Sequence, residues 1–227
     1  MKLHHGGWAL LAALLLGAAG LAQADTLTGV LPATPGGTNY QAYYDSTTNL
    51  TWLANANVNG AMTWSQANNW AAGLDINGVT GWTLPTTTQP DSSCSLQEPV
   101  SGPVSGFPTQ GYGYNCTGSE MGELYYDAGI RGSSAGQFSN VQSYPYWSAT
   151  EFAPDTNYVW GFDFGNGYQD YGLKDNGVFF LLAWAVHAGN VGAPPTVPEP
   201  GAISLMLVGL ALVGLAARRR LALRSFE

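Results

Sequence analysis

The stretch of sequence richest in groups that could bind a ligand runs from residue 151 to residue 176. Carboxylates and side-chain amides alternate there with aromatic residues. Its polar candidates are Glu151, Asp155, Asn157, Asp170, Asp175 and Asn176, together with Asp163 and Asn166. Carboxylate and amide oxygens are calcium ligands, and aromatic rings beside hydrogen-bonding groups suit sugars. The pattern therefore predicts a glycan site or a calcium site, although the spacing matches no EF-hand loop.

The same stretch also has a purely structural interpretation. Tyr158, Trp160, Phe162 and Phe164 alternate strictly, which places them on one face of a strand that a core would cover. The acidic residues would then only solvate the turns. In either case we expect the tryptophans of the strand-like segments to be buried structural residues; they are Trp82, Trp147, Trp160 and Trp184.

No set of residues typical of catalysis is present. The only histidine outside the first few residues, His187, ends an apolar stretch, and a histidine in that position is more often structural than a general base. A general base also needs a positioned nucleophile. The sequence contains no His-Glu-x-x-His and no glycine-rich phosphate loop. We therefore expect a protein that is not an enzyme, with no catalytic residue and no cofactor apart from the calcium considered above.

The elements that must position these residues are strands and two helices. Thr63 and Gln66 form a capping box at the start of an amphipathic helix over 63–74, and a second helix begins near Ser119, where Glu120 and Glu123 favour its first turn. The strand-like segments are 40–45, 49–53, 81–85, the strands from 144 onward and the apolar run 179–186. That last run suits a central strand covered on both faces. This order predicts an α+β fold with a mostly antiparallel sheet.

Both ends of the chain carry targeting signals. Residues 1–24 form a signal peptide with a positive start, an apolar run and the cleavage site Ala22-Gln23-Ala24. Near the other end, the apolar run 201–217 precedes Arg218, Arg219 and Arg220, which predicts a single membrane helix with its arginines in the cytoplasm. Between them we expect a lead-in over 25–39, one domain over 40–187 and a linker over 188–200.

The exported body is acidic and contains two cysteines. Thirteen acidic residues stand against Arg131 and Lys174, a net charge near −11, which excludes nucleic acid as a partner. Cys94 and Cys116 lie in one Ser-, Pro- and Gly-rich segment, and an even number in an oxidising compartment favours a disulfide. Zinc, the alternative, usually takes four ligands.

The C-terminal segment resembles a PEP-CTERM sorting signal over 197–224. The residues that carry the resemblance are Pro198, Glu199 and Pro200, the apolar run and the arginine cluster. The resemblance implies processing by an exosortase in a Gram-negative bacterium that makes exopolysaccharide. The exosortase and the secretion machinery are then the expected partners. The protein would be held at the membrane by its C-terminal helix and, after processing, reach the cell surface or matrix.

The body resembles the Lcl C-terminal domain family over about 40–187. The residues that carry this resemblance are Asn49-Leu50-Thr51-Trp52, Gly81-Trp82-Thr83-Leu84-Pro85, Tyr146-Trp147-Ser148-Ala149-Thr150, Trp160-x-Phe162-x-Phe164 and Ala183-Trp184-Ala185-Val186. The resemblance implies a C-type-lectin-like fold. The chain departs from the family at Thr83 and His187, where arginine is usual, and in its inserted cysteine loop.

Together these patterns predict a non-enzymatic, lectin-like surface domain that binds extracellular glycan or surface partners. One alternative is a purely structural envelope or biofilm-matrix protein without a specific ligand. A second is an enzyme of the formylglycine-generating type, which uses a cysteine pair; the position of both cysteines in an inserted loop argues against it.

Overall fold

The computed structural model describes residues 27–99, 106–175 and 177–193. Several predicted features lie outside the described residues. They are the signal peptide, the sorting residues Pro198, Glu199 and Pro200, the apolar run 201–217 with its arginines, and Asn176. Within the described ranges, no helix combines the length and the apolar character needed to cross a bilayer.

One sheet joins the beginning and the end of the domain. Its strands are β1 (Leu27–Pro32), β2 (Tyr40–Asp45), β3 (Leu50–Leu53) and β9 (Val186–Ala188), antiparallel and in that spatial order. The predicted hairpin over 40–53 is confirmed, and the Asp45 carboxylate closes its turn by accepting from the Thr47 amide. The expected lead-in contains β1, so this segment contributes the edge strand of the sheet.

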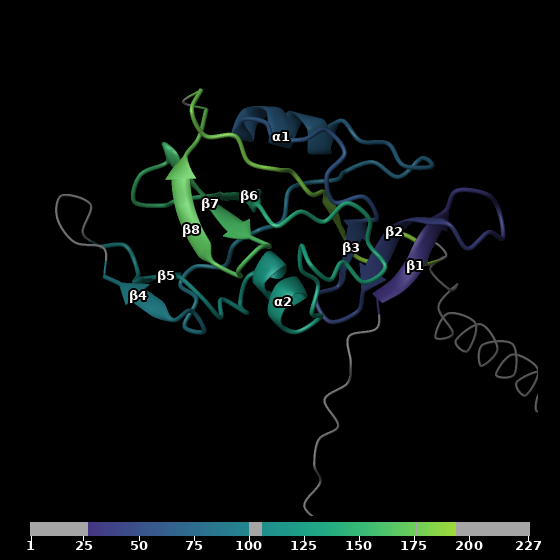
Figure 1. The fold of residues 1–227 in the computed structure, drawn as a ribbon. Coiled ribbons are helices and arrows are strands. Elements are labelled where there is room, and N and C mark those ends of the chain that lie inside the picture. The colour runs from purple at the N-terminus through teal and green to yellow at the C-terminus, as the bar shows by residue number, and fades with distance from the viewer. Residues whose placement is uncertain (1–26, 100–105, 176, 194–227) are drawn as a thin grey trace, which may run out of the picture. The chain divides into compact units, whose positions relative to one another are not determined.

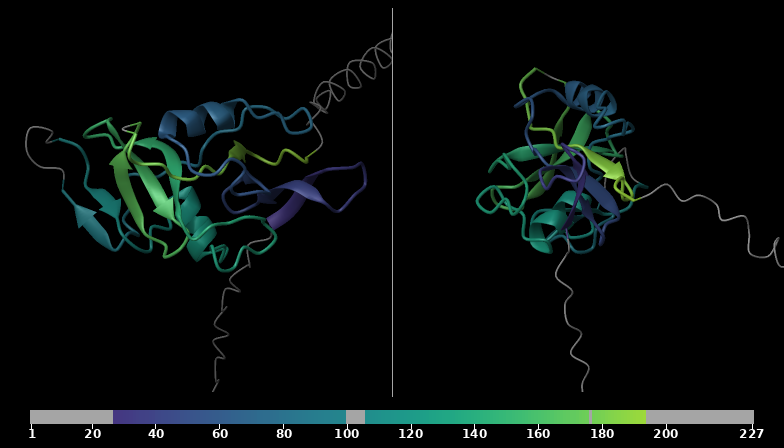
Figure 2. Two further views of the ribbon diagram at one scale, coloured as in Figure 1. Left: turned by 45° about the horizontal axis from the view of Figure 1, so that its top comes forward. Right: turned by 90° about the vertical axis from the view of Figure 1, so that its right-hand side faces the viewer.

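A second antiparallel sheet consists of β6 (Pro145–Glu151), β7 (Tyr158–Asp163) and β8 (Gln169–Leu173). A small hairpin of β4 (Leu96–Glu98) and β5 (Gln110–Tyr112) continues from it, because the backbones of Gly113 and Gln169 exchange two hydrogen bonds of 2.8 Å. The β4–β5 hairpin and the β1–β2 hairpin lie at opposite ends of the domain (Figures 1 and 2).

Both predicted helices are confirmed. Helix α1 (Trp64–Ala72) begins at a complete capping box, in which Thr63 and Gln66 satisfy each other's backbone amides. Helix α2 (Glu120–Tyr126) carries acidic residues in its first turn and buries Met121 and Leu124. The two helices lie on opposite sides of β6–β8 (Figure 1). The α+β class with mostly antiparallel strands is therefore confirmed, whereas the C-type-lectin-like fold stays a prediction.

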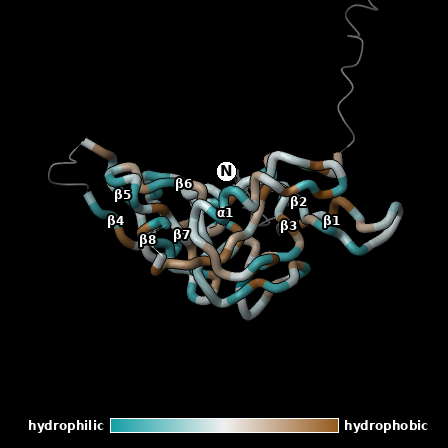
Figure 3. The backbone as a smooth tube through the Cα atoms, turned by 90° about the horizontal axis from the view of Figure 1, so that it is seen from above, coloured by the Kyte–Doolittle hydropathy of each residue, from teal (hydrophilic) through white to brown (hydrophobic). Residues whose placement is uncertain are grey.

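The core is built around tryptophans, and Trp184 lies at its centre. The Trp184 ring contacts Trp52 edge-on at 5.2 Å and Phe138 at 4.9 Å, and its indole nitrogen donates to the Leu53 carbonyl at 2.7 Å. The prediction that Trp82, Trp147, Trp160 and Trp184 are buried is confirmed, since each is at most 1% exposed. Figure 3 shows hydrophobic and hydrophilic segments interspersed along the backbone.

Two strand predictions are wrong. Residues 81–85 make only a single bridge, Thr83 to Val186, and the run 179–186 is not a central strand. That run crosses from one sheet to the other, and its residues form backbone bridges with different segments. Leu181 pairs with Met62 and Leu182 pairs with Tyr146. A crossing segment cannot keep one ladder of hydrogen bonds, so an apolar composition alone did not make it a strand.

Candidate functional site

A groove of about 280 Å³ lies between the β6–β8 sheet and segment 179–181. We call it the sheet groove. Its lining combines aromatic and aliphatic side chains with carboxylates and one amide. The lining residues are Pro145, Val159, Gly161, Phe162, Asp163, Asn166, Tyr168, Asp170, Tyr171, Gly172, Phe179 and Leu181.

Two glycines form the floor of the sheet groove. In the register of β7 and β8, Gly161 faces Asp170 and Val159 faces Gly172. A side chain at Gly172 would meet no atom within 4 Å, whereas one at Gly161 would lie 3.2 Å from the Leu181 side chain. The floor is thus flat and open beside Gly172, and the groove lies on the face of β7 opposite to Trp160.

Polar side chains of the groove are held by short turns. Asp163 Oδ1 accepts from the Gly165 amide at 2.7 Å, and Asp170 Oδ1 accepts from the Tyr171 amide at 2.8 Å. In the part of the chain that the structure describes, the second oxygen of each carboxylate accepts no hydrogen bond. Each carboxylate therefore keeps acceptor capacity for a ligand.

The electrostatic field in the groove is negative. Partial burial between the walls raises the pKa of Asp170 above its ordinary value, and the Tyr171 amide only partly opposes this. Desolvation, followed by the negative charge of Asp170, raises the pKa of the Tyr168 hydroxyl. No Lys, Arg or His occurs among the lining residues that the structure describes. The site consequently favours neutral or positively charged ligands over anions.

The predicted calcium residues do not gather around one point. Glu151 forms an ion pair with Lys174, and Asp155 accepts from the amide and side chain of Asn157 at 3.0 and 2.9 Å. Of the eight polar candidates, Asp163, Asn166 and Asp170 line the sheet groove, and Asn176 lies outside the described residues.

Asp175 has a structural partner on helix α1. Its carboxylate accepts from the Ser65 amide at 2.9 Å and from the Ser65 hydroxyl. Desolvation opposes ionisation of Asp175, but the Ser65 hydrogen bonds outweigh it and lower the pKa of this carboxyl. An ionised carboxylate at this end of a helix also complements the helix dipole. Asp175 thus anchors the start of α1 to the segment that follows β8.

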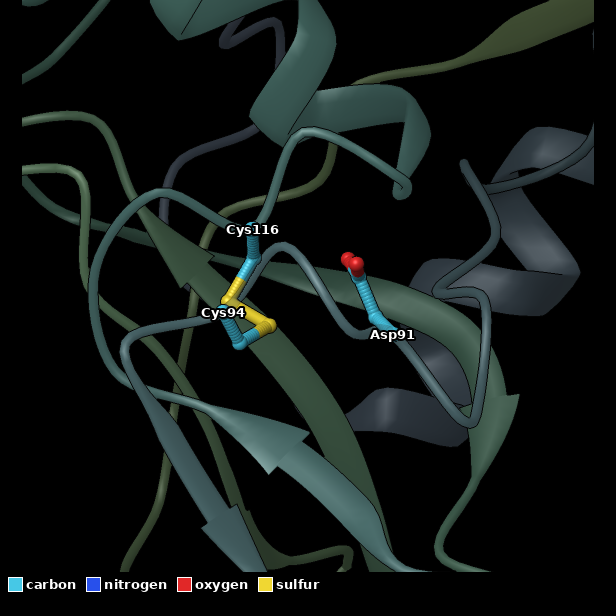
Figure 4. Close-up of side chains that lie close together, drawn as sticks. All are labelled: Asp91, Cys94 and Cys116. Carbon is cyan, nitrogen blue, oxygen red and sulfur yellow. A yellow bond between two sulfur atoms is a disulfide. The ribbon is translucent and has the colours of Figure 1, made fainter.

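Among the described residues, a single cluster has the composition and spacing of a metal site. It consists of Asp91, Cys94 and Cys116, whose ligand atoms lie within 4.8 Å of one another. Figure 4 shows the two sulfurs bonded to each other, with the Asp91 carboxylate beside them. The predicted disulfide is confirmed, with Cα atoms 4.1 Å apart. Asp91 accepts from the Ser93 and Gly118 amides at 3.0 and 3.2 Å, so it braces the same corner.

The histidine predicted to be structural has structural neighbours. The His187 ring packs edge-on against Trp82 with centroids 5.6 Å apart, and its Nδ1 lies 2.7 Å from the Ala188 carbonyl oxygen. His187 does not line the sheet groove.

The sequence interpretation missed several residues of the groove. It assigned Phe179 and Leu181 to a central strand and did not consider Gly161 and Gly172. A signal was available, because Gly161 and Asp163 alternate with the large aromatic residues of the same strand. Small and polar residues on the alternate positions indicate a face that is not filled by core packing.

Comparison with known protein families gave two matches. The Lcl C-terminal domain matches residues 41–186, and the PEP-CTERM protein-sorting motif matches residues 196–220. Neither the curated proteins nor the solved structures gave a match.

Proposed function

Because the chain belongs to the Lcl C-terminal domain family and carries a PEP-CTERM sorting motif, we propose that it binds extracellular polysaccharide through the sheet groove. The sorting motif makes it an exported protein that an exosortase sorts. Such a protein is located among the polymers of the cell surface and matrix, where polysaccharide ligands for a sugar-binding site are present.

The observation that carries the proposal is the composition of the groove. Sugar rings have apolar C–H faces and polar edges, so they are recognised by aromatic rings beside hydrogen-bond acceptors. Tyr168 and Phe179 provide aromatic surface, and Asp163 and Asp170 provide acceptors. The floor leaves room for a flat ring beside Gly172, where a Cβ would meet no atom within 4 Å.

Phe179→Ala should weaken polysaccharide binding about fivefold to tenfold, because the variant loses a ring contact of roughly 1 kcal/mol. The ring is 45% exposed, so its removal should change the thermal midpoint little. The measurement is a glycan array followed by calorimetric titration of the full-length protein in detergent.

Val178→Ala is the matched control, since Val178 is 75% exposed and does not line the groove. It should bind as the wild type does. Equal binding by wild type and Phe179→Ala would place any sugar site elsewhere. A wild type that binds no glycan at all would favour the purely structural matrix role.

Deletion of residues 201–227 should convert the protein from a membrane-bound to a soluble exported form. The apolar run drives insertion and Arg218, Arg219 and Arg220 resist crossing, so the full-length chain should remain in the membrane fraction when the exosortase gene is absent. With the exosortase present, we expect a cut near Pro198-Glu199-Pro200. Fractionation of both strains with mass analysis of the product measures this. A full-length, soluble protein in both strains would contradict both the anchor and the cut.

A further inference from the structure

We propose that the sheet groove prefers polysaccharides whose sugars carry free ammonium groups over their acetylated, neutral and acidic counterparts. This inference rests on the proposed function and specifies the ligand of the same site.

The charges that face the groove are negative. Asp163 and Asp170 line it, and each keeps one carboxylate oxygen without a hydrogen bond from the described residues. The negative charge of Asp170 reaches the hydroxyls of both Tyr168 and Tyr171, and that of Glu98 reaches Tyr171 as well. Negative charge therefore comes from β8 and from the neighbouring hairpin, and an anionic sugar would be repelled.

The positive charges of the described residues lie outside the groove. Lys174 pairs with Glu151 and lies 4.7 Å from the centre of the Trp64 ring. Arg131 lies 4.7 Å from the centre of the Tyr125 ring. These two residues are the only Lys or Arg of the described ranges, and neither lines the groove. The uronate or sulfate groups of an acidic polysaccharide would thus find no cation there.

The carboxylates of the groove match a ligand group that only donates hydrogen bonds. An ionised carboxylate only accepts hydrogen bonds, whereas an ammonium group only donates, with three N–H bonds. A sugar ammonium group between Asp163 and Asp170 would form charge-assisted bonds while its ring lies on Tyr168 or Phe179. An acetamido group offers one N–H and no charge, so acetylation removes most of this gain.

The test titrates full-length protein in detergent with three hexasaccharides of equal length. They are a glucosamine hexamer with free amino groups, its fully N-acetylated form and a galacturonic acid hexamer. We expect the amino form to bind roughly tenfold more tightly than the acetylated form, and its affinity to fall as salt is added, because the charges are partly exposed. We expect no measurable binding of the acidic form.

The double variant Asp163→Asn, Asp170→Asn should abolish the preference and leave binding of the acetylated hexamer unchanged. Asp127→Asn is the matched control, because it removes one exposed carboxylate at the end of α2, outside the groove. The Asp170→Asn change alone should not lower the thermal midpoint at pH 7, since burial disfavours the ionised form that it replaces.

Two different failures are distinguishable. Equal binding of the amino and acetylated hexamers, with loss of both in Phe179→Ala, would overturn the amino-sugar preference and leave the proposed function standing. Absence of binding by all three hexamers would overturn both. If a lysine hexapeptide displaced the amino hexamer and bound more tightly at the same groove residues, the occupant would be a basic peptide and the inference would be wrong.

Discussion

Trp184→Ala should lower the free energy of unfolding by about 3–5 kcal/mol, the range for a large aromatic residue removed from a core. Trp184 is fully buried and contacts Trp52, Phe138 and Phe164. Its removal would also leave the Leu53 carbonyl without the indole donor at 2.7 Å. Urea denaturation followed by tryptophan fluorescence and circular dichroism measures the change.

Trp70→Ala provides the control for the loss of a tryptophan. Trp70 lies on α1 and is only partly buried against the core, so less apolar area and a smaller cavity are involved. We expect its effect to be clearly smaller than that of Trp184→Ala. Equal effects of the two substitutions would show that the packing around Trp184 does not dominate the stability of the domain.

Replacement of both Cys94 and Cys116 by serine should cost about 3 kcal/mol of stability, because the disulfide closes a loop with a sequence separation of 22. Cys116 is fully buried and Cys94 is 5% exposed, so the serine hydroxyls would also enter a covered environment. The amide of Gln169 lies 3.6 Å from the Cys94 sulfur, which connects the bridge to β8.

Treatment with reductant separates the effect of losing the disulfide from the effect of replacing the two cysteine side chains. Wild type should lose stability when reduced, whereas the double serine variant should not respond to reductant. Two free thiols in the non-reduced protein, found by mass spectrometry after alkylation, would contradict the bond outright. If the wild type and the double variant had equal free energies of unfolding, closing the loop would not stabilise the domain.

Local signals predicted the secondary structure best. The capping box at Thr63 and Gln66 depends on residues three positions apart, and the hairpin over 40–53 depends on a short turn. Both could be read from neighbouring residues, and both are present. The burial of Trp160 followed from the alternation along one strand.

Predictions that depended on distant partners failed or remained incomplete. The run 179–186 is apolar because it crosses between two sheets, and sequence periodicity does not separate that from a central strand. The groove could not be predicted because it needs segment 179–181 to lie beside β7 and β8, with Leu181 over Gly161. Likewise, Glu151 and Asp175 are similar in sequence terms to Asp170, but they have partners in Lys174 and Ser65.

The pairing of β9 with β3 bears on the timing of maturation. Leu50 pairs with Ala188 and Thr51 with His187, so the first sheet cannot close until almost the whole domain has been delivered. In a chain that emerges N-terminus first, β1–β3 lack their β9 partner until these last residues have emerged. Contacts between distant segments also form slowly. The sorting motif begins at residue 196, only a few residues after β9. The last strand and the sorting motif are therefore delivered almost together, so the first sheet can close only when the sorting motif is about to follow.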